Sequence, residues 1–200
     1  MKNLNFGIPL WLVMFLLSAC ASISTVAPET PPAETTPKYY PLDTRTGLQT
    51  IDVVLEAVSS GDHQKLVDLF SYTSTACKTV NALGGPPACR ASEVEGTMVE
   101  VLPFLGPEGS FLRKDEATNF PGLSVLGIHA IYRVSDTAYS EADYPAGEYG
   151  IMLIGADNKQ WNILQVKNGR IIRIDYIFDA RSFNEILQRD ASSLILEPLS

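Results

Sequence analysis

The chain has 200 residues, with 23 acidic and 15 basic side chains that give a formal net charge of −8 at pH 7. Its lysines and arginines form no cluster along the sequence. An acidic chain without a basic patch is not expected to bind nucleic acid, or to bind an anionic lipid surface by charge. No catalytic signature and no cofactor or metal motif is present, so the sequence indicates neither a reaction nor a cofactor.

The first twenty residues, MKNLNFGIPLWLVMFLLSAC, have the layout of a secretory signal. Lys2 and the amino terminus supply positive charge, and a mostly apolar run follows from Leu4 to Leu17. This run is too short to cross about 30 Å of hydrocarbon as a helix. Two small residues then precede Cys20.

The end of this segment, Leu17-Ser18-Ala19-Cys20, resembles the lipobox of bacterial lipoproteins. The resemblance implies that residues 1–19 are a signal peptide and that Cys20 is acylated. It also implies an anchor in the cell membrane or outer membrane, with the domain facing the periplasm or the cell exterior. Ala21, rather than Asp, follows the cysteine, which in some Gram-negative lipoproteins permits transport to the outer membrane. An ordinary cleaved signal peptide and an uncleaved anchor are the alternatives.

Residues 21–46 are rich in Pro, Thr, Ser, Ala and Glu and show neither a helical nor a strand period. Such a composition cannot bury enough apolar surface to offset the entropy of ordering, and its prolines keep the chain extended. We therefore expect residues 20–46 to form the lipidated cysteine and a disordered linker. Residues 47–200 are long enough for one core and are expected to form a single domain.

Two helices are expected at the start of this domain. Apolar residues recur at helical spacing from Leu48 to Val58, and Gly61 can end that helix. Asp62 can cap a second helix, which carries apolar residues on one face up to Phe70.

A polar loop rich in Gly and Pro, TACKTVNALGGPPACR, contains Cys77 and Cys89. With Cys20 used for lipid, an even number of cysteines remains in an exported and therefore oxidising compartment. We expect a structural disulfide between Cys77 and Cys89, with reduced thiols as the alternative. A metal site is disfavoured because no histidine is near the two cysteines.

The remaining segments alternate or are rich in β-branched residues, and Asn168-Gly169 is a strong signal for a tight hairpin turn. Ser182 and Glu185 have the spacing of a capping box at the start of a last helix. The expected strands are residues 97–104, 110–113, 125–134, 148–155, 160–166 and 170–178. Helices at one end of antiparallel strands predict an α+β fold.

The segments SSGDHQKLVDLF and WNILQVKNGRIIRIDYIFD resemble the NTF2-like, or SnoaL-like, family. This resemblance implies N-terminal helices packed on a curved antiparallel sheet, the NTF2-like or cystatin-like cone, here followed by a C-terminal helix. Members of this family include enzymes, binding modules and structural domains, so the resemblance does not select a function.

Strand alternation suggests which side chains face the helices. In residues 125–134, the apolar face contains Ile128, Ala130 and Tyr132, and the opposite face contains His129. In residues 170–178, the apolar face contains Ile172, Ile174, Tyr176 and Phe178, and the opposite face contains Arg173 and Asp175. We expect the apolar faces to pack against the helices, and His129, Arg173 and Asp175 to lie on an outer or interface surface.

Three functions are compatible with these features. The first is a non-catalytic binding or interaction domain on a lipid anchor, with Tyr132, Trp161 and Tyr176 either lining a pocket for a small apolar ligand or forming core. The second is an NTF2-like isomerase or dehydratase acting on a small apolar substrate through His129 or Asp115. The third is a structural subunit of a cell-envelope assembly that binds a protein partner or a second copy. The loop at residues 135–147 is expected to be a lid, a contact segment or a solvated loop.

Overall fold

The computed structural model describes residues 38–80, 83–157, 160–179 and 182–199. Cys20, the signal segment and the first part of the expected linker lie outside these residues. The described chain is mixed α+β, which confirms the predicted class. In chain order its elements are α1 (Gln49–Ser60), α2 (His63–Val67), β1 (Thr73–Ala76), β2 (Met98–Leu105), β3 (Ser110–Arg113), the 3₁₀ helix η1 (Lys114–Asn119), β4 (Val125–Val134), β5 (Tyr149–Gly155), β6 (Trp161–Lys167), β7 (Arg170–Ile177), α3 (Ser182–Asp190) and β8 (Ala191–Leu196).

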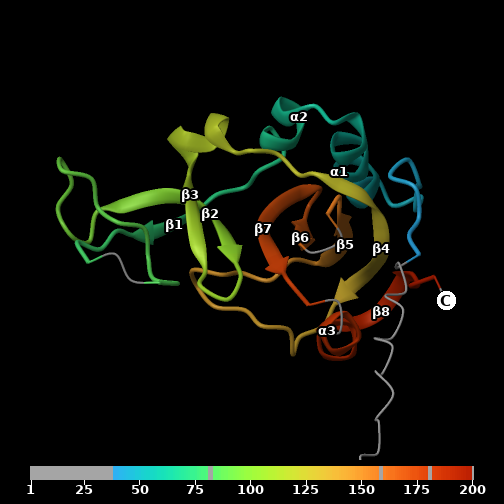
Figure 1. Cartoon of the computed structure of the whole chain (residues 1–200). Coiled ribbons are helices and arrows are strands. Elements are labelled where there is room, and N and C mark those ends of the chain that lie inside the picture. Colours follow the sequence, from blue (N-terminus) through green and yellow to red (C-terminus); the bar gives the residue numbers. More distant parts are fainter. Residues whose placement is uncertain (1–37, 81–82, 158–159, 180–181, 200) are drawn as a thin grey trace, which may run out of the picture. The chain divides into compact units, whose positions relative to one another are not determined.

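The strands form one curved, open sheet in the order β1-β2-β7-β6-β5-β4-β8, and β3 also pairs with β2 (Figure 1). Most neighbours are antiparallel, as expected. The exception is β2, which runs parallel to β7 through the pairs Phe104–Ile174 and Leu105–Asp175. The sequence pattern could not show this, because a two-residue period records which residues share a face and not the direction of the neighbouring strand.

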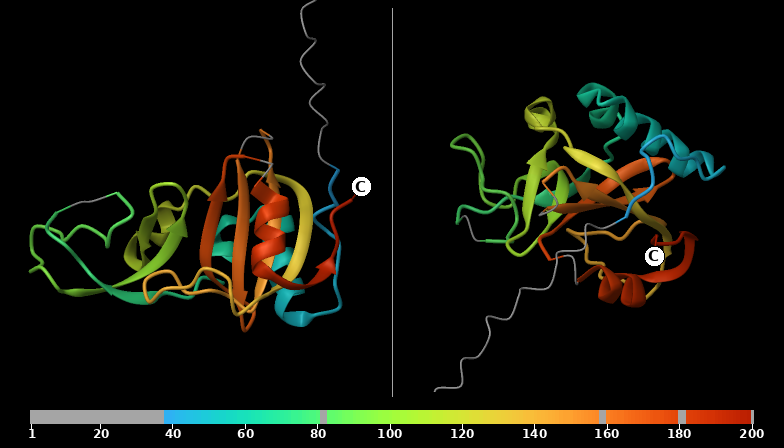
Figure 2. Two further views of the ribbon diagram at one scale, coloured as in Figure 1. Left: turned by 90° about the horizontal axis from the view of Figure 1, so that it is seen from below. Right: turned by 45° about the vertical axis from the view of Figure 1, so that its right-hand side comes forward.

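The helices cover both faces of the sheet. α1 and α2 lie on one face and α3 on the other, with the strands between them (Figure 2). The core on the α1 side includes Ile51, Val54, Leu55, Leu102, Ile128, Ile131, Ile151, Leu153, Leu164 and Ile174. The core on the α3 side is Ala130, Tyr132, Met152, Ile154, Trp161, Ile163 and Phe183. Burying apolar side chains on both faces therefore fixes the sheet between two helical layers.

A β-bulge in β4 overturns the predicted alternation of that strand. Ile128 pairs with Leu153, but the next pair joins Ala130 to Met152, so two residues of β4 oppose one residue of β5. Ile128 consequently belongs to the core on the α1 side, whereas Ala130 and Tyr132 belong to the core on the α3 side. The expectation that these three side chains share one face is wrong.

Several local predictions hold at the level of single residues. Gly61 ends α1 in the left-handed conformation, with φ of 64°. The Asp62 carboxylate accepts hydrogen bonds from the backbone amides of Gln64 and Lys65 at the start of α2. Asn168 and Gly169 both have positive φ, as the hairpin between β6 and β7 requires.

The folded part of the chain begins before the expected domain boundary at residue 47. Tyr40 exchanges two backbone hydrogen bonds with Ile128 of β4, of 2.8 and 2.9 Å. The ring of Tyr39 lies over Gly127, where an added Cβ would come within 2.2 Å of the ring. Tyr39 and Tyr40, placed in the linker by composition, therefore pack against the sheet, and Thr46 bonds to Asp52 of α1.

The disulfide between Cys77 and Cys89 is present, as predicted, with their Cα atoms 4.9 Å apart. It closes the loop between β1 and β2. Within the described residues, no helix combines the length and the apolar character needed to cross a bilayer.

Candidate ligand-binding site

The candidate site begins with a cross-strand pair at one end of the sheet. Asn162 of β6 lies directly opposite Tyr176 of β7. Two residues further along each strand, Leu164 opposes Ile174, and both belong to the core on the α1 side. Because side chains two residues apart share a face, Asn162 and Tyr176 extend this face beyond the end of the core.

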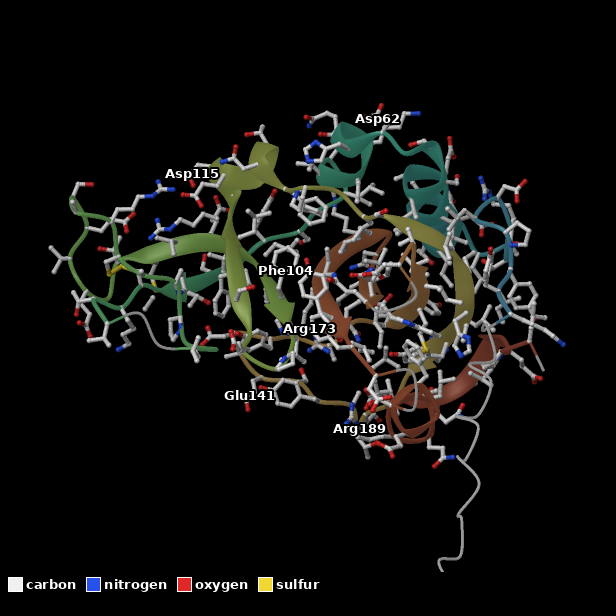
Figure 3. All side chains as sticks on the ribbon, in the orientation of Figure 1. Asp62, Phe104, Asp115, Glu141, Arg173 and Arg189 are labelled. Atoms are coloured by element: carbon white, nitrogen blue, oxygen red, sulfur yellow. A yellow bond between two sulfur atoms is a disulfide. The ribbon has the colours of Figure 1, made fainter. Side chains whose placement is uncertain are left out.

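Tyr176 stacks on Phe104 across the parallel pairing of β2 and β7. The two ring centroids are 5.5 Å apart and the rings are inclined by 10°. Figure 3 shows Phe104 between these two strands. Phe120 packs on the other side of Phe104, with its centroid 5.9 Å away. Burial raises the pKa of Tyr176 to about 12, so its hydroxyl stays protonated and can donate or accept a hydrogen bond at neutral pH.

Three adjoining hollows surround Tyr176, and together we call them the Tyr176 groove. The first, of about 420 Å³, is mainly apolar and is lined by Phe104, Gly106, Pro107 and Phe178 among others. The second, of about 520 Å³, lies against Gly122, Ser124, Gln160 and Asn162. A smaller hollow of about 230 Å³ adjoins Phe104, Phe120 and Pro121. The two larger hollows fall in the size range of small-molecule sites.

Asn162 carries the least satisfied polar group of this groove. Only 3% of the residue is exposed, and it nevertheless lines the second hollow. Its side-chain oxygen, Oδ1, is buried and has no hydrogen-bond partner within the described part of the chain. An unsatisfied buried carbonyl costs about 1–3 kcal/mol. Asn162 therefore places at the second hollow an acceptor atom to which no described residue donates a hydrogen bond.

The three aromatic residues singled out in the sequence do not meet. Tyr176 lines the groove, but Tyr132 and Trp161 are 0% and 2% exposed within the core on the α3 side. The ring of Tyr132 lies across Gly150 of β5, where an added Cβ would approach it to 2.2 Å. Tyr132 and Trp161 are thus core residues, the second of the two alternatives given above.

His129 and Asp115, the residues considered for catalysis, lie in unrelated places. The His129 ring contacts Phe183 of α3 and Trp161, at centroid distances of 5.2 and 5.5 Å. Both its ring nitrogens are buried and have no partner among the described residues, and burial lowers its pKa. Asp115 is exposed at the start of η1, where hydrogen bonds from Arg90 lower its pKa (Figure 3). His129 therefore packs in the core on the α3 side and is not on an outer surface.

Arg173 and Asp175 are also buried, contrary to the expectation of an outer surface. They are 2% and 8% exposed, and two hydrogen bonds of 2.6 and 3.0 Å join the guanidinium to the carboxylate. Gln165 of β6 donates a third hydrogen bond to Asp175, of 3.1 Å. Desolvation raises the pKa of the Asp175 carboxyl, and its interaction with Arg173 opposes that effect.

The guanidinium of Arg173 also holds the loop at residues 135–147. Its Nη1 donates to the backbone carbonyls of Tyr139, Tyr144 and Pro145, at 2.8 to 3.2 Å. Figure 3 shows Arg173 beside the part of this loop that carries Glu141. The loop is therefore not freely solvated. None of these bonds places it over the Tyr176 groove. It covers Arg173 and Asp175 on the α3 side of the sheet.

One cluster of metal-ligating residue types occurs in the described chain. Ligand atoms of Cys77, Cys89 and Glu93 lie within 4.8 Å of one another. The two sulfur atoms are bonded to each other, so neither is available as a thiolate ligand. The Glu93 carboxylate is paired with Arg113. This cluster is a disulfide beside an ion pair.

Sequence reasoning identified Tyr176 as a pocket candidate but missed Phe104, Gly106 and Asn162. The sequence carried no signal for this pair. A two-residue turn at Asn168-Gly169 would place Asn162 opposite Asp175, and a register shift between Gln165 and Val166 moves the pairing to Tyr176. Comparison of the chain with protein families, with curated proteins and with solved structures finds no match.

Proposed function

We propose that the protein is an exported lipoprotein, anchored through lipid on Cys20, whose NTF2-like domain binds a small apolar ligand without catalysing a reaction. The Tyr176 groove is the observation that supports the ligand-binding part of this proposal. It combines a stacked aromatic pair, a mainly apolar hollow of about 420 Å³ and a buried amide oxygen that has no partner in the described chain. Small-molecule sites have this composition, with apolar walls and a few fixed polar groups.

The proposal is tested by titrating the full chain in detergent with benzothiophene, a two-ring apolar probe, and following backbone amide shifts by NMR. Shifts are expected to change around Gly106, Asn162 and Tyr176. The variant Gly106→Leu should weaken binding about tenfold or more, because its side chain occupies the hollow that the probe needs. An added Cβ at Gly106 lies 3.6 Å from Tyr176, an ordinary contact, so the variant is compatible with the fold.

Ala91→Leu is the matched control, because it places the same side chain in an exposed turn away from the groove. It should leave the dissociation constant unchanged. The proposal is wrong for this site if benzothiophene moves no signal near Tyr176, or if Gly106→Leu and Ala91→Leu bind it equally well.

The lipid anchor is tested separately, because Cys20 lies outside the described residues. Labelled fatty acid should enter the wild-type protein, and Cys20→Ser should remain unlabelled and accumulate as the precursor. An intact mass that corresponds to an unmodified chain beginning at another residue would rule the anchor out.

One observation favours the assembly subunit as a second candidate. β8 pairs with β4 on one side and ends the strand order of the described sheet. Its residues carry no charge, and Leu194 is 42% exposed. Uncharged edge strands can pair with another chain. A dimer in sedimentation experiments that Leu194→Lys converts to a monomer would support this candidate, and a monomeric wild type would exclude self-association through this edge.

A further inference from the structure

We infer that the Tyr176 groove selects a planar apolar molecule that carries a hydrogen-bond donor and no negative charge. This inference rests on the proposed binding function, because it specifies the ligand of the same groove. Three properties of the groove carry it: an unused acceptor, a flat aromatic wall and the signs of its charges.

The acceptor is Oδ1 of Asn162. It lies on β6 between two neighbours on the same face, Leu153 of β5 and Tyr176 of β7. Leu153 offers no hydrogen-bonding group, and no described residue donates to Oδ1. A ligand N–H or O–H group that reaches this atom gains a hydrogen bond and also removes the penalty of an unpaired buried carbonyl. Donor-bearing ligands should therefore be favoured over shape-matched ligands that lack the donor.

The flat wall lies in the adjoining hollow. Tyr176 stacks on Phe104, and both residues line this hollow together with Pro107 and Phe178. Phe178 is 59% exposed, which leaves its ring available for contact. Planar molecules pack well against such surfaces, since aromatic rings prefer offset-stacked or edge-to-face contacts. Because Tyr176 borders both hollows, one ligand can contact this wall and reach Asn162.

The charges of the described lining disfavour an anionic ligand. Among the described residues, no lysine, arginine or histidine lines any of the three hollows. Glu108 lines the first hollow and Asp157 the second. A carboxylate or phosphate bound here would meet no cationic side chain of the described lining, and in the first hollow it would face the Glu108 carboxylate, which has the same sign. The groove therefore suits neutral or cationic molecules and disfavours fatty acids and phosphate esters.

A pair of two-ring probes tests the donor directly on the full-length wild type. Indole carries one N–H donor, and benzothiophene has a similar size and shape without it. Titrations followed by amide NMR should give a dissociation constant for indole about tenfold lower than for benzothiophene. In Asn162→Leu the two probes should bind equally. Asn184→Leu, the same substitution at an exposed position of α3, should retain the tenfold preference.

The outcomes separate this inference from the proposed function. If both probes move signals around Tyr176 with equal affinity, the groove binds apolar molecules but the donor inference is wrong. If neither probe moves them, the proposed function fails as well. The comparison of indole with benzothiophene on the wild type needs no variant. It therefore tests the inference even if Asn162→Leu does not fold. Indole-3-acetate, which carries a negative charge, should bind more weakly than indole. Tighter binding of indole-3-acetate would overturn the inference that the groove disfavours anions.

Discussion

Strands β6 and β7 place buried polar side chains on both faces of the sheet, and the two faces treat them differently. On the α3 side, Gln165 and Arg173 both donate hydrogen bonds to Asp175, and Arg173 also donates to three carbonyls of the loop at residues 135–147. On the α1 side, Oδ1 of Asn162 has no partner in the described chain, and Tyr176 borders a groove. The same two strands thus carry a closed polar network and an open polar site.

The difference teaches that burial alone does not identify a functional polar residue. Arg173 and Asp175 are buried charges, which sequence reasoning often associates with function, but their bonds are used to fix a loop. Asn162 is an uncharged residue whose side-chain oxygen accepts no hydrogen bond from the described chain. Unpaired atoms also occur on the α3 side, at His129 and the Tyr132 hydroxyl, but neither residue lines any of the hollows described above.

The largest expected effect comes from breaking the closed network. Arg173→Met should lower the free energy of unfolding by about 3–5 kcal/mol, because it leaves Asp175 as a buried charge without its partner and frees three loop carbonyls. Denaturant unfolding measures this loss. The double variant Arg173→Met with Asp175→Leu should recover part of it, since no unpaired charge remains. A loss below 1 kcal/mol in the single variant would show that the network does not hold the loop.

Removing the disulfide should give the next largest effect. The bridge joins residues 12 apart in sequence, and replacing Cys77 and Cys89 by Ala should cost about 2–4 kcal/mol. Its loop supports the closed side of the molecule, because the Tyr144 hydroxyl donates to the carbonyl of Gly84. Hydrogen exchange should therefore accelerate around Tyr144 and stay unchanged at Asn162. Equal acceleration at both sites would contradict the separation of the two regions.

Asn162→Leu should change stability in the opposite direction. It replaces a buried amide, whose oxygen has no partner in the described chain, by an apolar side chain of similar size, which should raise the free energy of unfolding by about 1 kcal/mol. Thermal or denaturant unfolding of the variant and of Asn184→Leu gives the comparison. A clear loss of stability in Asn162→Leu would mean that the amide is bonded in solution, and the distinction between the two faces would no longer hold.

The smallest expected effect is a pH dependence from His129. Burial lowers its folded-state pKa below the unfolded value of about 6.5. The unfolded chain therefore binds more protons as the pH falls through 6.5, and the stability present above this pH is progressively lost. His129→Phe should remove this part of the loss between pH 7.5 and 5, and Asp175 contributes equally to both proteins. Parallel stability curves for the two proteins would show that His129 is solvated.

The parts of the fold that sequence predicted are those set by neighbouring residues. Gly61, Asp62 and Asn168-Gly169 act through local backbone geometry, so their roles could be assigned without knowing the rest of the chain. β1 and β8 were missed. Both lie at the ends of the strand order, and the exposure pattern of β8 does not alternate, because its register with β4 shifts twice. A period of two cannot detect such a strand.

The site was less predictable because its defining property is a missing contact. Tyr176 could be proposed as a pocket residue from its face of the strand. The significance of Asn162 depends on what its neighbours do not supply, and that requires the positions of Leu153, Tyr176 and the loop before β4. The bulge at Ala130 shows the same limit, since one inserted residue moved Tyr132 to the opposite face from Ile128.

The pairing of Tyr40 with Ile128 determines how the domain responds to a mechanical load. A force applied at Lys38, on the side of the proposed anchor, reaches the sheet through the two hydrogen bonds of this pair. β4 remains paired with β5 and β8 when those two bonds break. If the proposed anchor at Cys20 is correct, the Tyr40–Ile128 pair is therefore expected to yield to tension before the pairs that hold β4 in the sheet.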